Sequence, residues 1–164
     1  DLLQAAVDGM RPEAEKRDQR ITLRRSPSTL RMVADPDRVL QVVTNLLSNA
    51  LKFSADGTTV TVTAGIDSEG PASPAREAER WVAIEVEDQG PGIPPEDLER
   101  IFGEWVRAST RERRGMGIGL TLSRRLAEYM GGALTARSKV GKGSTFTLWL
   151  PHGRVPEQRS GWIG

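Results

Sequence analysis

The sequence contains no cysteine and only one histidine, His152. The lack of cysteine excludes disulfide bonds, thiolate catalysis and zinc sites built on cysteine ligands. A single histidine also excludes a metal site with several histidine ligands and a catalytic pair of histidines. The chemistry of this chain must therefore depend on carboxylates, amides, hydroxyls, arginine and lysine side chains, and the backbone.

Long apolar runs and an excess of charge of one sign are also missing. No apolar stretch approaches the ~20 residues that a membrane-spanning helix needs, and we expect neither a signal peptide nor a membrane contact by this domain. The 23 basic and 22 acidic residues give a net charge of +1, which does not suggest a nucleic-acid partner. The length of 164 residues and the 37% hydrophobic content are typical of one globular domain.

Hydrophobic periodicity predicts an alternation of helices and strands. The most regular pattern is a helix that opens at Asp35-Pro36, the residue types of an N-cap and a first turn. Further helices are expected at 1–19, 95–102 and 118–130, and strands at 21–25, 30–34, 58–66, 81–87, 133–138 and 144–150. Pro12 is expected to kink or restart the first helix, and Gly131-Gly132 to end the last one.

Three segments are expected to be irregular. Residues 67–80 have the composition of a long solvated hairpin connection, and residues 151–164 of a polar C-terminal tail. Residues 103–114 hold four arginines and few apolar side chains, which predicts a mobile loop. Because several strands are joined by hairpin-length loops, we expect an α+β fold with helices on one face of a mixed sheet.

The predicted long helix carries Asn45, Asn49 and Lys52. The two asparagines are four residues apart, so their amides share one helix face, and Lys52 joins that face three residues later. Two amide oxygens and a nearby cation suit a hard metal ion and phosphate oxygens. The alternative is that these amides are solvated or bonded to a neighbouring helix.

Three glycine-containing motifs follow. Asp88-Gln-Gly90-Pro-Gly92 comes directly after a predicted strand, where a carboxylate can accept a hydrogen bond from an exocyclic amine; the alternative is an Asp-initiated turn. Gly115-Met-Gly117-Ile-Gly119-Leu120 opens a helix and can present backbone amides to an anion. Gly141-Lys-Gly143-Ser144-Thr-Phe146 enters the last strand and taken alone is a glycine hairpin. None of these motifs has the context of a Rossmann fingerprint, and no Walker A loop occurs.

Taken together and in this order, the motifs resemble the ATP-binding catalytic domain of bacterial sensor histidine kinases, within a superfamily that includes gyrase, Hsp90 and MutL. The resemblance covers residues 1–150 and has five parts. They are the N box (Asn45–Phe53), the G1 box (Asp88–Gly92), the F box (Phe102), the G2 box (Gly115–Gly119) and the G3 box (Gly141–Phe146). It implies a two-layer α/β sandwich of the Bergerat type, with ATP held between helices and a flexible lid formed by residues 103–116.

The resemblance also implies roles for single residues. Asn49 would ligate Mg²⁺, Asn45 and Lys52 would lie at the phosphates, and these three form the catalytic set. Asp88 would accept the adenine amino group, with the Ser144 hydroxyl helping it to hold a water. The remaining expected nucleotide contacts are Phe53, Gly90, Gly92, Ile93, Phe102, Arg107, Gly115, Gly117, Ile118, Gly119 and Leu120.

The implied function is transfer of the γ-phosphoryl group of ATP to a histidine on a separate helical dimerisation domain, followed by relay to a response regulator. Hydrolytic superfamily members generally carry a Glu where this chain has Asn45, which favours a kinase over an ATPase. A serine-kinase relative and a non-catalytic nucleotide-binding module remain alternatives. No acceptor histidine precedes the domain and His152 is expected in a solvated tail, so we expect a fragment or split subunit, cytoplasmic and monomeric when isolated, that is inactive without its acceptor domain.

Overall fold

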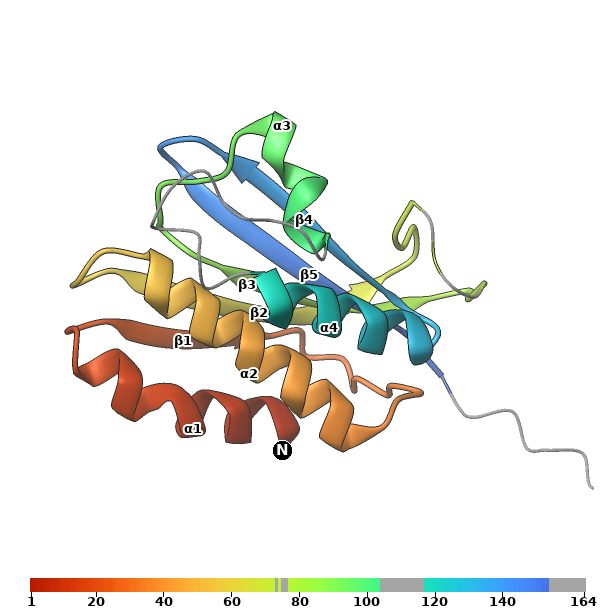
Figure 1. The fold of residues 1–164 in the computed structure, drawn as a ribbon. Helices are drawn as coiled ribbons and strands as arrows, with labels where there is room; N and C mark the ends of the chain where they lie inside the picture. The colour runs from red at the N-terminus through yellow and green to blue at the C-terminus, as the bar shows by residue number, and fades with distance from the viewer. Residues whose placement is uncertain (73, 75–76, 104–116, 154–164) are drawn as a thin grey trace, which may run out of the picture.

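The computed structural model describes residues 1–72, 74, 77–103 and 117–153, which form a two-layer arrangement of helices on a sheet (Figure 1). The sheet has five strands in the order β1-β2-β3-β5-β4. Their bounds are Arg20–Arg25 (β1), Thr59–Asp67 (β2), Trp81–Glu87 (β3), Ala133–Lys139 (β4) and Gly143–Pro151 (β5). Strands β1 and β2 are parallel, and all other neighbours are antiparallel. The mixed α+β fold expected from the sequence is confirmed.

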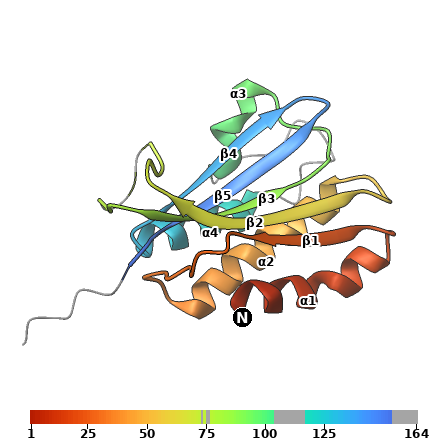
Figure 2. The ribbon, with the colours of Figure 1, turned by 180° about the vertical axis from the view of Figure 1, so that it is seen from behind.

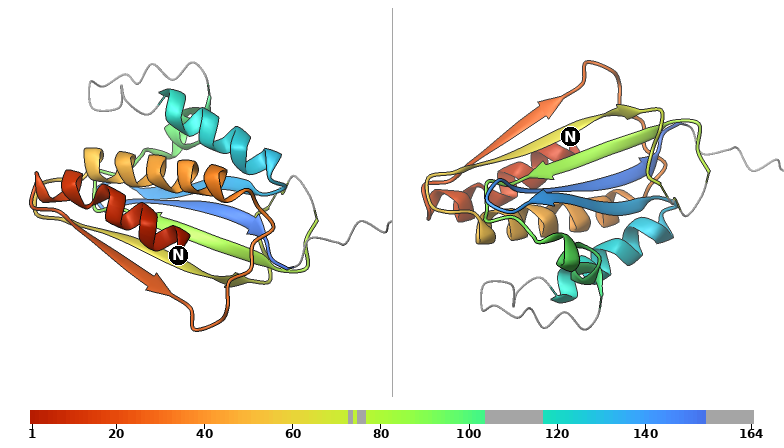
Figure 3. Two further views of the ribbon diagram at one scale, coloured as in Figure 1. Left: turned by 90° about the horizontal axis from the view of Figure 1, so that it is seen from below. Right: turned by 90° about the horizontal axis from the view of Figure 1, so that it is seen from above.

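The helices cover one face of this sheet. Their bounds are Leu2–Glu15 (α1), Pro36–Phe53 (α2), Pro95–Leu98 (α3) and Gly117–Tyr129 (α4), with a 3₁₀ turn, η1, at Arg100–Phe102. The views from below and above show α1, α2 and α4 side by side on the same side of the sheet (Figure 3). Seen from behind, the sheet lies in front of these helices, and none of the described helices covers its other face (Figure 2).

Alternation along the strands places one set of side chains under the helices. Val60 and Val62 in β2, and Ile84 and Val86 in β3, are 0–1% exposed. They meet the apolar stripe of α2, whose buried members are Val39, Val42, Val43, Leu46, Leu47, Ala50 and Leu51. Asp35 caps α2 as expected, because its side chain accepts from the Asp37 amide at 2.9 Å. The core therefore fixes α2, the helix that carries the candidate asparagines.

Several local expectations need correction. Residues 30–34 form no strand; they meet the end of the sheet through an isolated bridge between Met32 and His152 and through the Val33 amide, which donates to the Pro151 carbonyl oxygen at 3.1 Å. The chain at His152 is also tied by its own amide, which donates to the Arg80 carbonyl oxygen at 3.0 Å, so the expected tail does not begin at residue 151. Helix α1 continues through Pro12 to Glu15, and the expected helix 95–102 is divided into α3 and η1.

The connection between β2 and β3 is a hairpin, as expected, and part of it packs on the sheet. The Asp67 carboxylate accepts from the amides of Glu69 and Gly70 at 2.7 and 2.9 Å. Gly70 then lies so close to the Trp81 ring that a Cβ atom would overlap it, and Trp81 is only 2% exposed. Among the described helices, none is long and apolar enough to cross a membrane.

Candidate nucleotide-binding site

The side chain of Asn45 joins two helices. Its Nδ2 donates to the Ser123 Oγ of α4 at 2.9 Å, across 78 positions of sequence. Its Oδ1 lies so close to Gly119 that a Cβ atom there would overlap it, so a larger residue at that position of α4 would have to displace the Asn45 side chain. The interhelical alternative considered from the sequence thus applies to Asn45. Ser123 is 3% exposed and was not expected at the site, because nothing in the sequence pairs it with the N box.

Asn49 is held differently, although it lies on the same helix one turn later. The residue is 8% exposed, and its Nδ2 has no hydrogen-bond partner among the described residues. A buried donor without a partner costs roughly 1–3 kcal/mol, so this amide is poised for a ligand atom. Lys52 is exposed, and its ammonium lies 5.6 Å from the centre of the Phe53 ring.

The residues around Asn49 fit a magnesium ion bound together with phosphates. Mg²⁺ keeps several waters and usually takes only one or two protein ligands beside substrate phosphates. An amide oxygen is a suitable hard ligand, and Asn49 supplies one from a buried and rigid position. In the described part of the chain, no group of three His, Asp or Glu side chains forms a cage that would hold the ion by itself.

Asp88 follows β3 directly and is 7% exposed. Its Oδ1 accepts from the amides of Gly90 at 2.8 Å and Ser144 at 3.3 Å, while Oδ2 has no partner among the described residues. Burial raises the pKa of the Asp88 carboxyl; the two backbone hydrogen bonds oppose this and the nearby Glu87 charge adds to it. The Asp-initiated turn considered from the sequence is therefore present, and it leaves one carboxylate oxygen for a ligand.

One glycine of the G1 box, Gly92, and one of the G3 box, Gly143, are required by protein packing. At Gly92, with φ of +77°, a Cβ atom would overlap the Lys139 carbonyl oxygen and lie 2.8 Å from the Val140 Cα. At Gly143, with φ of +103°, it would overlap the Asp88 carbonyl oxygen. These two loops therefore pack backbone against backbone beside Asp88, which is a different reason for glycine from close approach of a base.

Two serine hydroxyls, those of Ser138 and Ser144, connect the two loops beside Asp88. The Ser144 hydroxyl, in a residue 6% exposed, lies 2.8 Å from the Ser138 hydroxyl, and Ser138 Oγ accepts from the Ile93 amide at 2.7 Å. Ser138 was missed from the sequence, although the expected hairpin of 133–138 with 144–150 places it opposite Ser144. The Ser138 hydroxyl thus links the loop after Asp88 to the start of β5.

Other expected contacts lie close by or inside the core. The Phe102 ring packs edge-on against Phe146, with centroids 6.2 Å apart, and Arg124 lies over it at 5.2 Å. Leu120 is 0% exposed and Ile93 is 4% exposed, so both side chains pack in the core. Arg107, Gly115 and the other lid residues from 104 to 116 lie outside the described residues, as does the side chain of Ile118; Gly117 is the first residue of α4.

A pocket of about 700 Å³ opens between the end of α2 and the loop after Asp88. It is lined by Arg17, Lys52, Phe53, Ser54, Ala55, Gln89, Gly90, Pro91 and Gly141. Three of these residues, Lys52, Phe53 and Gly90, were expected from the sequence to touch a nucleotide. Arg17 was not, and it comes from the segment between α1 and β1.

Residues 34–154 match the family described as histidine kinase-, DNA gyrase B- and HSP90-like ATPase. The chain belongs to this family. Within it, the chain is a catalytic domain of the histidine-kinase type, because its relatives are named sensor kinases. One is the adaptive-response sensory kinase SasA of Prochlorococcus marinus, 42% identical over 120 residues that cover 72% of this chain and 29% of the relative. The sensor histidine kinase WalK of Bacillus subtilis is 37% identical over 131 residues, which cover 78% of this chain and 20% of WalK.

Solved structures agree with this family assignment. Full-length ShkA in complex with AMPPNP superposes with a TM-score of 0.77 and 29% identity, covering 94% of this chain and 30% of that one. The catalytic domain of the histidine kinase ThkA superposes with a TM-score of 0.74 at 24% identity, covering 92% of this chain and 90% of that one. This match shows the shared fold. This ATPase domain spans less than a third of the length of SasA and WalK.

Proposed function

We propose that this domain binds Mg-ATP and transfers the γ-phosphoryl group to a histidine on a separate helical dimerisation domain, which then supplies a response regulator. The observation that carries the proposal is the buried Asn49 amide, whose Nδ2 has no partner among the described residues. This donor has a cost that a phosphate oxygen of the nucleotide would remove by accepting from Asn49 Nδ2, while the amide oxygen remains for Mg²⁺.

The proposed roles of the residues follow from their positions. When bound, Mg²⁺ supplies charge neutralisation on the phosphate oxygens, and Asn49 would hold it there. Asp88 would accept the exocyclic amine of adenine through its free Oδ2, since Oδ1 is held by Gly90 and Ser144. Lys52 would attract the phosphates from the edge of the pocket.

The state of Asn45 favours phosphoryl transfer to a protein over hydrolysis. An amide has no basic site for the proton of an attacking water, and the Asn45 Nδ2 is already engaged with Ser123. Without a base at this position, water near the γ-phosphate is poorly activated. We therefore expect the chain alone to bind Mg-ATP, to turn it over slowly, and to leave His152 unlabelled.

The experiment mixes the chain with its cognate helical domain and γ-labelled ATP. We expect acid-labile, alkali-stable phosphate on the helical partner, loss of the label with Asn49→Ala, and parent-level labelling with Ser48→Ala, an exposed neighbour on α2 that serves as the control. Rapid ATP hydrolysis by the chain alone would instead support the ATPase alternative. Stable phosphoserine on an added protein would support a serine kinase, and nucleotide binding without any transfer a signalling module.

Adenine selection gives a second test of the same proposal. Asp88→Ala should weaken ATP and ADP binding by the same factor, because both share the base. GTP should bind the parent at least about tenfold more weakly than ATP, since guanine presents an oxygen where adenine presents an amine and leaves Asp88 unpaired. Equal affinities for ATP and GTP would contradict the role given to Asp88.

A further inference from the structure

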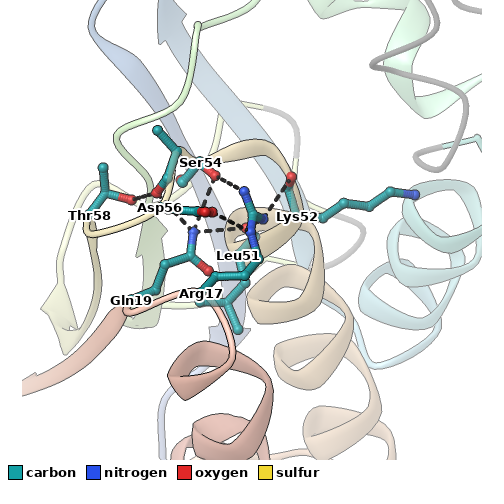
Figure 4. A network of polar contacts seen from close by, with 8 residues as sticks. Arg17, Gln19, Leu51, Lys52, Ser54, Asp56 and Thr58 are labelled. Atoms are coloured by element: carbon teal, nitrogen blue, oxygen red, sulfur yellow. Dashed lines mark hydrogen bonds and ion pairs between the residues drawn. The ribbon is translucent and has the colours of Figure 1, made fainter.

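Two side chains from the segment after α1 hold the C-terminal end of α2 (Figure 4). Arg17 donates through Nη1 to the carbonyl oxygens of Leu51 at 2.5 Å and Lys52 at 3.2 Å, and through Nη2 to that of Ser54 at 2.7 Å. Its Nε is paired with the Asp56 carboxylate at 2.7 Å. All three guanidinium nitrogens of Arg17 therefore donate hydrogen bonds to one short stretch of chain, residues 51–56.

Gln19 binds the same stretch of chain from the protein interior. Its Nε2 lies 3.0 to 3.2 Å from the carbonyl oxygens of Leu51, Ser54 and Ala55, and the residue is 4% exposed. Asp18, between the two, has a φ of +52°, so the chain turns sharply there. Residues 17 and 19 both lie outside the segment 34–154 that matches the family.

This end of α2 needs such partners. The last carbonyls of a helix have no amide to accept within it, and the Ser54 backbone is extended, with ψ of 150°, so the helix does not continue. A cation at this end also interacts favourably with the helix dipole. Arg17 supplies both the donors and the charge.

The same stretch forms one wall of the pocket. Arg17, Lys52, Phe53 and Ser54 line it, and the Phe53 carbonyl oxygen lies 3.0 Å from where a Cβ atom on Gly90 would be. A shift of the α2 end would therefore move Lys52 and Phe53 and press on the loop that follows Asp88. The positions of Lys52 and Phe53 depend on Arg17, because it binds the backbone carbonyls on both sides of them.

We propose that Arg17 is a positioning residue for nucleotide binding: by holding the carbonyls of Leu51, Lys52 and Ser54, it sets where Lys52 and Phe53 stand at the pocket. The inference rests on the proposed function, since it concerns the affinity of that same site. It makes the turn between α1 and β1, which lies before the family segment, a working part of the binding site.

The test measures Mg-ATP and Mg-ADP dissociation constants at a temperature where every variant is fully folded. Arg17→Met removes the fork and the charge and should weaken both nucleotides about five- to tenfold, by the same factor. Arg17→Lys keeps the charge on a flexible stem without the planar fork, and should recover part of the loss. Hydrogen exchange of amides 51–58 should accelerate in Arg17→Met.

Two control variants separate positioning from general stability. Asp56→Asn removes the ion pair of an exposed carboxylate but leaves the bonds to the α2 carbonyls, so its affinity should stay within about twofold of the parent. Arg11→Met breaks an exposed pair with Asp8 on α1 and should change nothing. If Arg17→Met and Arg17→Lys lower the unfolding midpoint but bind as the parent does, Arg17 is only a structural cap and the inference is overturned. A parent that binds no nucleotide would instead overturn the proposed function.

Discussion

Gly92 and Gly57 allow the backbone packing beside Asp88 to be measured directly. Both residues have a φ of +77°, so alanine is strained to the same degree at either position. At Gly57 an added Cβ atom would meet nothing within 4 Å. At Gly92 it would overlap the Lys139 carbonyl oxygen and lie 2.7 Å from the carbonyl carbon of the same residue. The pair therefore separates backbone strain from steric overlap.

The expected magnitudes follow from these two terms. A left-handed non-glycine residue costs about 1–2 kcal/mol, partly offset by the about 0.4–1 kcal/mol gained from a stiffer unfolded chain, so Gly57→Ala should lose about 1 kcal/mol. Gly92→Ala loses this amount and a further 1–3 kcal/mol or so, because backbone atoms rather than a flexible side chain must move. We expect a total near 3 kcal/mol, or about 6–12 °C in Tm for a chain of this size.

The assay is urea unfolding of the two variants and the parent, with nucleotide affinity measured on the folded proteins. Gly92→Ala should also weaken nucleotide binding, because the turn at Lys139 leads into Gly143 and Ser144, which contact Asp88. Gly57→Ala should bind as the parent does. Equal losses of stability in the two variants would refute the conclusion that the loops pack backbone against backbone.

Three further predictions concern the site. Burial raises the Asp88 pKa, so the cost of its charge is absent at acid pH and grows as the pH rises; the stability of Asp88→Asn relative to the parent should increase from about pH 3 to pH 7, and a pH-independent difference would contradict this. Asn49→Ala should reduce the benefit of Mg²⁺ to ATP binding more than it reduces binding in EDTA, and full retention of that benefit would exclude a metal role. Ser123→Ala should lose about 1 kcal/mol in urea unfolding because Asn45 Nδ2 loses its acceptor; parent-like midpoints would show that the bond contributes nothing.

The sequence was sufficient for the parts of the fold that follow a regular pattern. The α2 helix, its Asp35 cap and the alternating strands could be predicted because burial repeats with the period of each element. The segment 30–34 was wrongly expected as a strand; it is joined by one bridge and its neighbouring hydrogen bonds to residues 151–153, which lie far away in the sequence. Alternation indicates the tendency to pair but cannot identify a partner at that separation.

The candidate site was predictable only in part, for a related reason. Asn49 and Asp88 stand out because their residue types and spacing carry chemistry. Arg17, Ser123 and Ser138 act through contacts that include residues 34, 78 and 45 positions away, and an isolated arginine or serine has no local signature. Their partners are set by the packing of helices and strands that lie far apart in the sequence, which the sequence alone does not show.

The bridge between Met32 and His152 has a consequence for how this end of the domain opens. Near it, the Val33 amide donates to the Pro151 carbonyl oxygen at 3.1 Å, and the Gly153 amide to that of Arg31 at 3.2 Å. These contacts tie the connection between β1 and α2 to the end of β5. Local opening at His152 should therefore also release the segment that leads into α2, so that amides on both sides of the bridge exchange together.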